Sequence, residues 1–302
     1  MKPVRVILQL FWIVSIVFLG GSCVPIQKNS AAAEALSKTI VATFEGSDCP
    51  DACTYMFFDQ PPEWTLYADG KLLVSKLADH GWMIEETIIP HTEVCRLLEQ
   101  IANDGFFKLD LAPYETEVKN VQPRGFTLLD TISVQRQQYR SIGIDTFLLS
   151  RLPAEVNNRL ALTPWFTVKQ RLDLLAAGRN TQTYHPDRVV IWASRNQQQN
   201  QAMAYLTESP NEGELSPMLA QRILNEVPFG SEGYVVLTGE LAIETSALFD
   251  NISLMHKAVR HNGELIHLSY RALLPDEDSQ VGSFGEIDKI EPMSLLPPNF
   301  CQ

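Results

Sequence analysis

Apolar residues recur along the chain at two different periods, and each period predicts one kind of element. Val94, Leu97, Leu98 and Ile101 stand three or four positions apart, which predicts an amphipathic helix that ends at Gly105. Elsewhere, β-branched and aromatic residues gather in short runs between turn residues, as they do in strands. The pattern therefore predicts a mixture of helices and strands.

Two dipeptides predict tight hairpin turns. Asp69-Gly70 lies within the strand-forming segment 63–75, and Asn262-Gly263 separates the segments 253–260 and 264–271. Asp-Gly and Asn-Gly tolerate the positive φ angles of a two-residue turn between antiparallel strands. We therefore expect both pairs of segments to form β-hairpins.

The remaining pattern adds strands and two further helices. Strands are predicted at 39–44, 82–89, 126–135, 139–144, 188–193 and 234–238. Thr163 and Ser216 are expected to be N-caps, because a proline follows each of them at the first helical position. Gly178 is expected to end the first of these helices, and the acidic, proline-rich segment after Pro275 to form an irregular tail. Hairpins interleaved with a few packed amphipathic helices predict an α+β fold with mostly antiparallel sheet.

A polar run at 196–201 divides the predicted elements. We expect an α+β domain at 39–195 and a second α+β region at 202–302, which either stands apart or packs as one body with the first. The segment 23–38 is polar, contains an alanine run and has no sustained apolar period. It is therefore expected to be a flexible tether.

The N-terminus has the pattern of an export signal. Lys2 and Arg5 precede an apolar run of 14 residues at 6–19, which is shorter than the roughly 20 residues of a membrane-spanning helix. Small residues then lead to Cys23, so residues 1–22 are expected to be a signal peptide. The rest of the chain is therefore expected to be extracytoplasmic.

This N-terminal segment resembles a bacterial lipoprotein signal, in which small residues precede an invariant cysteine. Gly21, Ser22 and Cys23 match that pattern, whereas Gly20 stands where the family has an aliphatic residue. The resemblance implies that a lipid on Cys23 anchors the protein to the cell envelope. Two alternatives are a plain secretory peptide, cut at the same bond or near Ala33 and leaving a secreted protein, and an uncleaved N-terminal anchor.

The charge and composition of the chain limit the classes of partner that it is expected to bind. Residues 23–302 carry 22 Lys and Arg against 36 Asp and Glu, a formal net charge of −14. Such a chain is repelled by phosphate backbones, so nucleic acid is not an expected partner. The expected partners are the membrane, through the N-terminal lipid, and an unidentified envelope protein or ligand.

Four cysteines remain beside Cys23, namely Cys49, Cys53, Cys95 and Cys301. In an oxidising compartment they are disulfide candidates, and four cysteines permit three pairings. Cys49 and Cys53 share one loop, and we expect them to be oxidised, either to each other or to Cys95 or Cys301. Their spacing differs from the Cys-x-x-Cys of redox and zinc sites, so they are not assigned as metal ligands.

The candidate chemistry is sparse. The segments 230–233 and 282–285 place a serine directly after a glycine, which is not the order of a nucleophile elbow. His256 and His267 lie on the two strands of the last hairpin and are weak zinc candidates. Asp276-Glu277-Asp278 offers oxygens to calcium but lacks the glycine pattern of an EF-hand. No catalytic, cofactor-binding or metal-binding residue is therefore assigned.

Paired carboxylates and aromatic residues have simpler interpretations. Glu85-Glu86, like the run at 276–278, is typical of a solvated face. The larger aromatic residues mostly stand at positions expected to face the core: Trp64, Tyr67, Trp82, Trp165 and Trp192.

The order of motifs between residues 39 and 145 resembles a group of uncharacterised exported bacterial domains. The motifs are the segment 64–70, Leu97-Leu98, Gly105-Phe106-Phe107 and Tyr114. The resemblance implies an extracytoplasmic domain of unknown function and carries over no catalytic residue. We therefore expect a non-catalytic binding or structural component of the envelope that needs no cofactor. The alternative is a secreted hydrolase whose site is assembled from residues distant in sequence.

Overall fold

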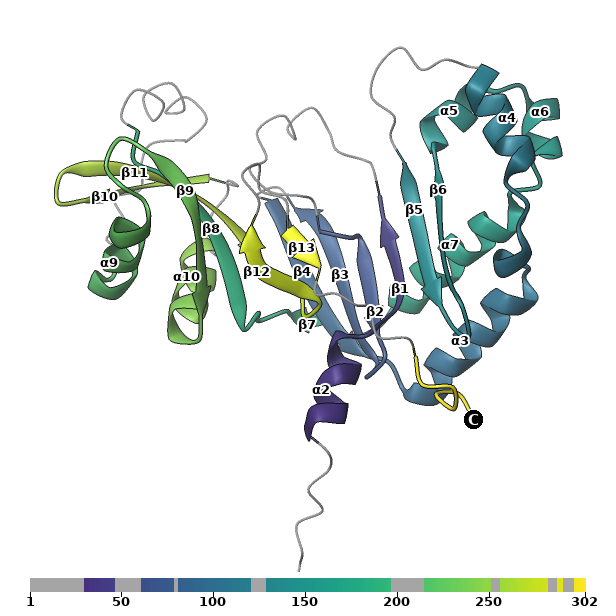
Figure 1. The fold of residues 1–302 in the computed structure, drawn as a ribbon, viewed down its shortest axis with the longest axis horizontal. Helices are drawn as coiled ribbons and strands as arrows, with labels where there is room; N and C mark the ends of the chain where they lie inside the picture. Colours follow the sequence, from purple (N-terminus) through teal and green to yellow (C-terminus); the bar gives the residue numbers. More distant parts are fainter. Residues whose placement is uncertain are drawn as a thin grey trace, which may run out of the picture. The chain divides into compact units, whose positions relative to one another are not determined.

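The computed structural model describes residues 30–46, 61–78, 81–120, 129–196, 215–250, 256–281, 287–289 and 296–302. The chain divides after Glu34 into two units, and the description below concerns the second, residues 35–302. Figure 1 shows its helices and strands.

The described helices and strands alternate along the chain. The helices are α2 (Ser30–Lys38), α3 (His91–Asn103), the 3-10 turn η2 (Phe106–Lys108), α4 (Ala112–Asn120), α5 (Thr146–Arg151), α6 (Ala154–Arg159), α7 (Thr163–Ala176), α9 (Pro217–Glu226) and α10 (Glu240–Asp250). The strands are β1 (Ile40–Glu45), β2 (Trp64–Tyr67), β3 (Lys71–Ala78), β4 (Gly81–Ile88), β5 (Asp130–Gln135), β6 (Tyr139–Ile144), β7 (Gln182–Thr183), β8 (Arg188–Ser194), β9 (Glu232–Thr238), β10 (His256–His261), β11 (Glu264–Ala272), β12 (Glu277–Val281) and β13 (Ile287–Lys289).

The strands form three sheets. A seven-stranded sheet has the order β6-β5-β1-β2-β3-β4-β7, a four-stranded sheet has the order β10-β11-β8-β9, and β12 pairs with β13. Every ladder between described strands is antiparallel. The predicted α+β fold with mostly antiparallel sheet is therefore confirmed.

One face of the seven-stranded sheet is covered by α3 and α7 (Figure 1). The predicted stripe of α3, from Val94 to Ile101, is buried in this core together with Trp165 and Val168 of α7. Because side chains alternate along a strand, residues two positions apart supply the facing layer, such as Ala42 and Phe44 on β1 and Trp64 and Leu66 on β2. Gly105, with a φ of 89°, takes the left-handed conformation just beyond α3.

The four-stranded sheet has its own core under α9 and α10 (Figure 1). Ile191 and Val235 lie on this face with Leu268 of β11, and α9 contributes Leu219 and Ile223. The predicted Asn262-Gly263 turn joins β10 to β11 with positive φ angles of 50° and 81°, as expected for a two-residue hairpin.

A third apolar cluster joins the two larger sheets. Tyr67 and Leu73, on the face of the seven-stranded sheet away from α3 and α7, pack with Ala272 and Leu274 from the end of β11. Within this contact the hydroxyl of Tyr67 donates a hydrogen bond of 2.6 Å to Asp276 Oδ1. Burial, with the charge of Asp276, raises the pKa of Tyr67, so the phenol stays protonated and remains a donor.

The structure differs from the sequence-based expectation at three places. The second half of the expected tether is helical, as α2, because alanine favours the helix. The expected irregular tail contains β12 and β13. Helix α7 begins at Thr163 with Leu162 as its N-cap, so Thr163 is the first helical residue rather than the cap. The N-cap assigned to Ser216 is confirmed, because its side chain accepts a hydrogen bond from Leu219 N at 3.2 Å.

Candidate functional site

A pocket of about 410 Å³ opens beside the seven-stranded sheet, where α7 ends. Pockets that bind small molecules have volumes of about 300–1,000 Å³, so this one is large enough for a small ligand. The lining residues come from β2 to β4 and from the end of α7: Glu63, Trp64, Val74, Ser75, Lys76, Glu85, Asp173, Ala176, Ala177, Gly178, Arg179 and Thr181.

Strand alternation brings charged residues of β3 and β4 to this pocket. Val74 packs against the core beneath the helices, so Lys76, two residues further along β3, lies on the same side of the sheet. Glu85 stands directly opposite Val74 in the antiparallel register. Lys76 Nζ donates to Glu85 Oε2 over 2.6 Å.

The end of α7 supplies the other wall. Gly178 adopts a φ of 72°, which turns the chain away from the helix axis, as the predicted helix stop requires. Arg179 Nε then donates to the carbonyl of Leu175 at 2.7 Å, which satisfies one carbonyl of the last helical turn. Thr181 Oγ1 donates to Glu85 Oε2 at 2.7 Å. The wall from α7 is thereby fastened to β4.

The electrostatics of the pocket favour ionised groups. The hydrogen bond from Lys76 lowers the pKa of Glu85, and the bond from Thr181 lowers it further. A glycosidase acid needs a carboxyl group whose pKa is raised. Glu85 is therefore unsuited to that role and carries its negative charge at neutral pH.

The structure shows the pairing of two of the four predicted disulfide candidates. Cys95 and Cys301 form a disulfide that links α3 to the C-terminal segment across 206 residues. The ring of Phe300 lies 4.7 Å from that of His91, and Leu296 is buried in the core beneath α3. Cys23, Cys49 and Cys53 lie outside the described residues. Cys49–Cys53 is now the remaining intramolecular pairing for that loop, and it stays a prediction.

The two candidate zinc histidines do not stand directly opposite each other. The register pairs His256 with Ser269 and His267 with Ala258. Among the described residues, no group of three or more His, Cys, Asp or Glu is placed to hold a metal ion.

Two of the carboxylates expected to form a solvated face, Asp276 and Glu277, are buried where the chain enters β12. Asp276 and Glu277 are 5% and 3% exposed, because Tyr67 binds the first and Arg271 the second. Their oxygens are therefore engaged within the protein, so the solvated interpretation of these two residues is wrong. Asp278 and the segment 282–285 fall outside the described side chains.

The aromatic residues and the first glycine-serine turn follow the expectation. Trp64, Tyr67, Trp165 and Trp192 are all buried, and the side chain of Trp82 is outside the described part. Gly230, with a φ of 80°, and Ser231, whose hydroxyl donates to the carbonyl of Pro228 at 2.6 Å, form a turn before β9.

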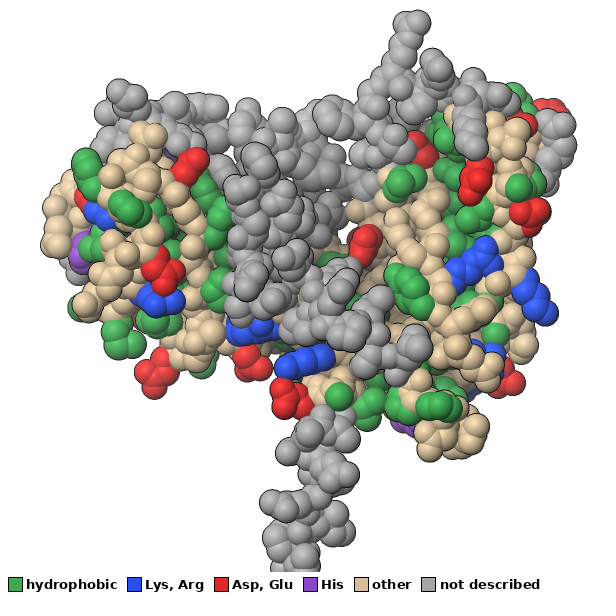
Figure 2. Space-filling model, in the orientation of Figure 1, with side chains coloured by type: hydrophobic (Ala, Val, Ile, Leu, Met, Phe, Trp, Pro, Cys, Tyr) green, Lys and Arg blue, Asp and Glu red, His purple; other side chains and the backbone are tan. Residues whose placement is uncertain are grey.

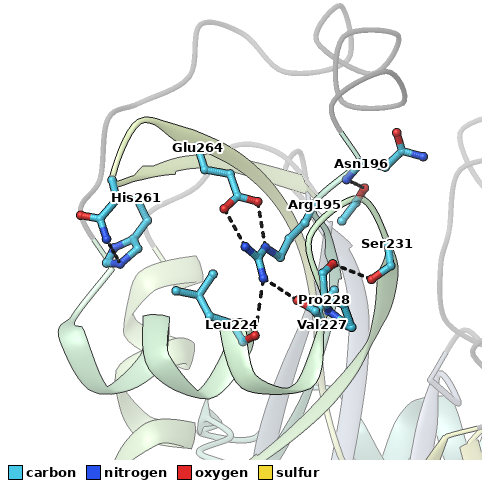
Figure 3. A network of polar contacts seen from close by, with 10 residues as sticks. Arg195, Asn196, Leu224, Val227, Pro228, Ser231, His261 and Glu264 are labelled. Atoms are coloured by element: carbon cyan, nitrogen blue, oxygen red, sulfur yellow. Dashed lines mark hydrogen bonds and ion pairs between the residues drawn. The ribbon is translucent and has the colours of Figure 1, made fainter.

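A second polar network, around Arg195, holds the end of α9 (Figure 3). Its guanidinium donates two hydrogen bonds of 2.8 Å to the carboxylate of Glu264 and one of 2.7 Å to the carbonyl of Val227. These bonds connect β8, β11 and the end of α9. Since they consume most of the donors of Arg195, the network acts as a structural clamp.

His267 is buried in an unusual way. It is 0% exposed on β11, opposite Ser194 and Ala258, and neither ring nitrogen has a hydrogen-bond partner in the described structure. Burial lowers its pKa below the ordinary 6.5. The neutral ring is therefore the form compatible with the folded protein.

We predict that stability falls as the pH is lowered through the range from 6.5 down to the depressed pKa of folded His267. In this range the unfolded chain binds the proton while the folded one does not. His267→Leu should remove this contribution and raise the free energy of unfolding at pH 7 by about 1 kcal/mol, because an unpaired polar ring is lost. Urea unfolding of the unmodified protein and of His267→Leu at pH 7.5 and pH 5 tests this prediction. If both proteins lose the same free energy of unfolding between pH 7.5 and pH 5, the prediction is contradicted.

The described surface offers no single apolar area on the face drawn in Figure 2. Green hydrophobic side chains are scattered there among charged and polar atoms. Over the whole described surface, the most exposed large hydrophobic side chains lie on different elements, such as Leu174 on α7, Phe229 after α9 and Ile243 on α10. Among the described residues drawn on this face, no contiguous patch of the kind that marks a protein-docking site is visible.

Sequence reasoning missed the charged pocket. In the sequence Glu85 stands out only as part of a carboxylate pair, and Lys76, Asp173 and Arg179 carry no local signal. The strand period places Lys76 on the side of β3 that packs beneath α7, and this was the one available clue.

The chain matches no protein-family model, no curated protein and no solved structure. None of the helices in the described ranges is both long and apolar enough to cross a membrane. The site is therefore interpreted from its own chemistry.

Proposed function

We propose that this chain is an extracytoplasmic, lipid-anchored protein that binds a small polar ligand in the pocket between β3, β4 and the end of α7. The charged lining of the pocket is the observation that carries the proposal. Glu85 is held ionised by Lys76 and Thr181, so the pocket offers fixed charges and not a group poised to transfer a proton. Such a site is suited to recognition.

The pocket can be tested by filling it. Ala177 lines the pocket and is exposed, so Ala177→Trp should occupy part of the space without disturbing the core. We expect one member of a panel of amino acids, sugars, nucleotides and divalent metals to raise the melting temperature of the full chain. A ligand at 100 times its Kd stabilises by about 2.7 kcal/mol, and Ala177→Trp should abolish this shift.

The matched control is Ala247→Trp, at an exposed alanine on α10. This variant should respond to the ligand as the unmodified protein does. A panel that produces no shift, or a shift that survives Ala177→Trp, would refute the proposed site. Ester or glycoside turnover abolished by one substitution would favour the hydrolase instead.

The anchor makes a separate prediction. The mature protein from its host should begin at Cys23 and carry acyl chains, and Cys23→Ala should release it from the membrane or stop its processing. Each buried methylene contributes about 0.8 kcal/mol to membrane binding, so several chains are needed for a durable anchor. Mass spectrometry of the N-terminus is the measurement, and an unmodified Cys23 or another first residue would rule the anchor out.

A further inference from the structure

We propose that the ligand is a small zwitterion of the amino-acid class, with its ammonium group at Glu85 and its carboxylate facing Arg179 and Trp64. This inference rests on the proposed function, because it names the ligand class of the same pocket. It follows from the hydrogen-bonding atoms that the lining leaves free.

The acceptor side of the pocket is provided by carboxylates. Both hydrogen bonds to Glu85, from Lys76 and from Thr181, end on Oε2, so Oε1 is without a partner among the described residues. Among the described residues, Asp173 is bonded only through Oδ2, to Lys169 at 3.4 Å. The carbonyl end of α7 adds partial negative charge to the same wall. An ammonium group is the natural partner of these oxygens.

The donor side consists of the ammonium group of Lys76, which has N–H donors beyond its bond to Glu85, and of two further nitrogens. Arg179 uses Nε for the carbonyl of Leu175 and Nη2 for Glu93, which leaves Nη1 without a partner in the described part of the chain. Trp64 is 3% exposed, and its indole N–H has no acceptor within the described structure. An indole nitrogen can only donate, and a buried donor without an acceptor is costly. An acceptor group on the ligand would serve Arg179 Nη1, and it would reach the buried indole N–H if the lining side chains shift on binding.

The balance of charge favours a ligand that carries both signs. The lining contains three carboxylates, at Glu63, Glu85 and Asp173, and two cations, at Lys76 and Arg179. A simple anion would meet the surplus of negative charge, and a simple amine would leave the donors of Lys76, Arg179 and Trp64 unmatched. A zwitterion satisfies both sets, and a pocket of about 410 Å³ has room for its side chain.

The test compares three forms of one molecule on the full chain by calorimetric titration. The first is the best-binding member of the common amino acids, the second is the amine that lacks its carboxylate, and the third is the acid that lacks its amino group. We expect the amino acid to bind at least tenfold more tightly than either half. Glu85→Gln should weaken binding at least tenfold, and Trp64→Phe, which keeps an aromatic ring but removes the donor, should weaken it severalfold.

Glu115→Gln is the matched control, because Glu115 is exposed on α4 and is not part of the pocket lining. This variant should bind the amino acid with the same affinity as the unmodified protein. An amine that binds as tightly as the amino acid, or a Glu85→Gln variant that binds normally, would overturn the inference. Binding of a sugar or nucleotide alone would also overturn it while leaving the pocket a ligand site, whereas the absence of any ligand would count against both proposals. If Glu85→Gln does not fold, the affinities of the three matched ligands for the unmodified protein still test the inference.

Discussion

Replacing Arg271 by alanine is expected to lower the free energy of unfolding by about 3–5 kcal/mol. Its two terminal nitrogens donate to the carboxylate of Glu277 at 2.8 Å and 2.7 Å, and both side chains are almost completely buried. Without Arg271 the carboxylate would keep, within the described part of the chain, only the bond from Leu274 N at 2.7 Å. An uncompensated buried charge is the source of the loss, and denaturant unfolding measures it.

The double variant Arg271→Met/Glu277→Gln is the control for this prediction. It removes both charges, fills the space of Arg271 with an apolar group and keeps an acceptor for Leu274 N, so it should recover most of the stability that the single variant loses. A double-mutant cycle then isolates the interaction between the two residues. A loss below about 1 kcal/mol for Arg271→Ala would show that the pair is hydrated in solution.

Cys301→Ser is expected to cost about 2–5 kcal/mol, because the disulfide with Cys95 closes a loop across 206 residues and restricts the unfolded chain. The release of Leu296 and Phe300 from the core beneath α3 would add to the loss. Thermal unfolding with and without a reductant measures the effect.

Two comparisons make this test specific. The double variant Cys95→Ser/Cys301→Ser should be no less stable than Cys301→Ser, because the bond is lost only once. Reductant should destabilise the unmodified protein more than either variant. Equal destabilisation of all three proteins would place the effect elsewhere, for example at Cys49 and Cys53.

Elements with a strong local signal could be predicted from the sequence. The stripe of α3 and the Asn262-Gly263 turn depend on residues within one helix or one hairpin, and both lie where predicted. Helix α10 was missed because its apolar residues are not confined to one face: Ala242 is buried whereas Ile243 is exposed. Strand β12 was missed because its start is held by Tyr67 and Arg271, through contacts that no local pattern reveals.

The candidate pocket was harder to predict from the sequence than the fold. Glu85 meets Thr181 across 96 positions of sequence, and only the pairing of β4 with β7 brings them together. The pairing of Cys95 with Cys301 was one of three that the sequence permitted, and the packing of the C-terminal segment on α3 selects it. Non-local contacts of this kind depend on the assembled core.

The position of β1 in its sheet has a mechanical consequence for an anchored protein. Within residues 35–302 the chain runs from the end of α2 directly into β1, which is paired with β2 on one side and β5 on the other. Tension from a membrane anchor at Cys23 would therefore act on an interior strand. Hydrogen bonds in an antiparallel ladder run across the strands, so a pull along β1 loads both ladders in shear. Many bonds would then resist together, whereas an edge strand can be peeled away one bond at a time.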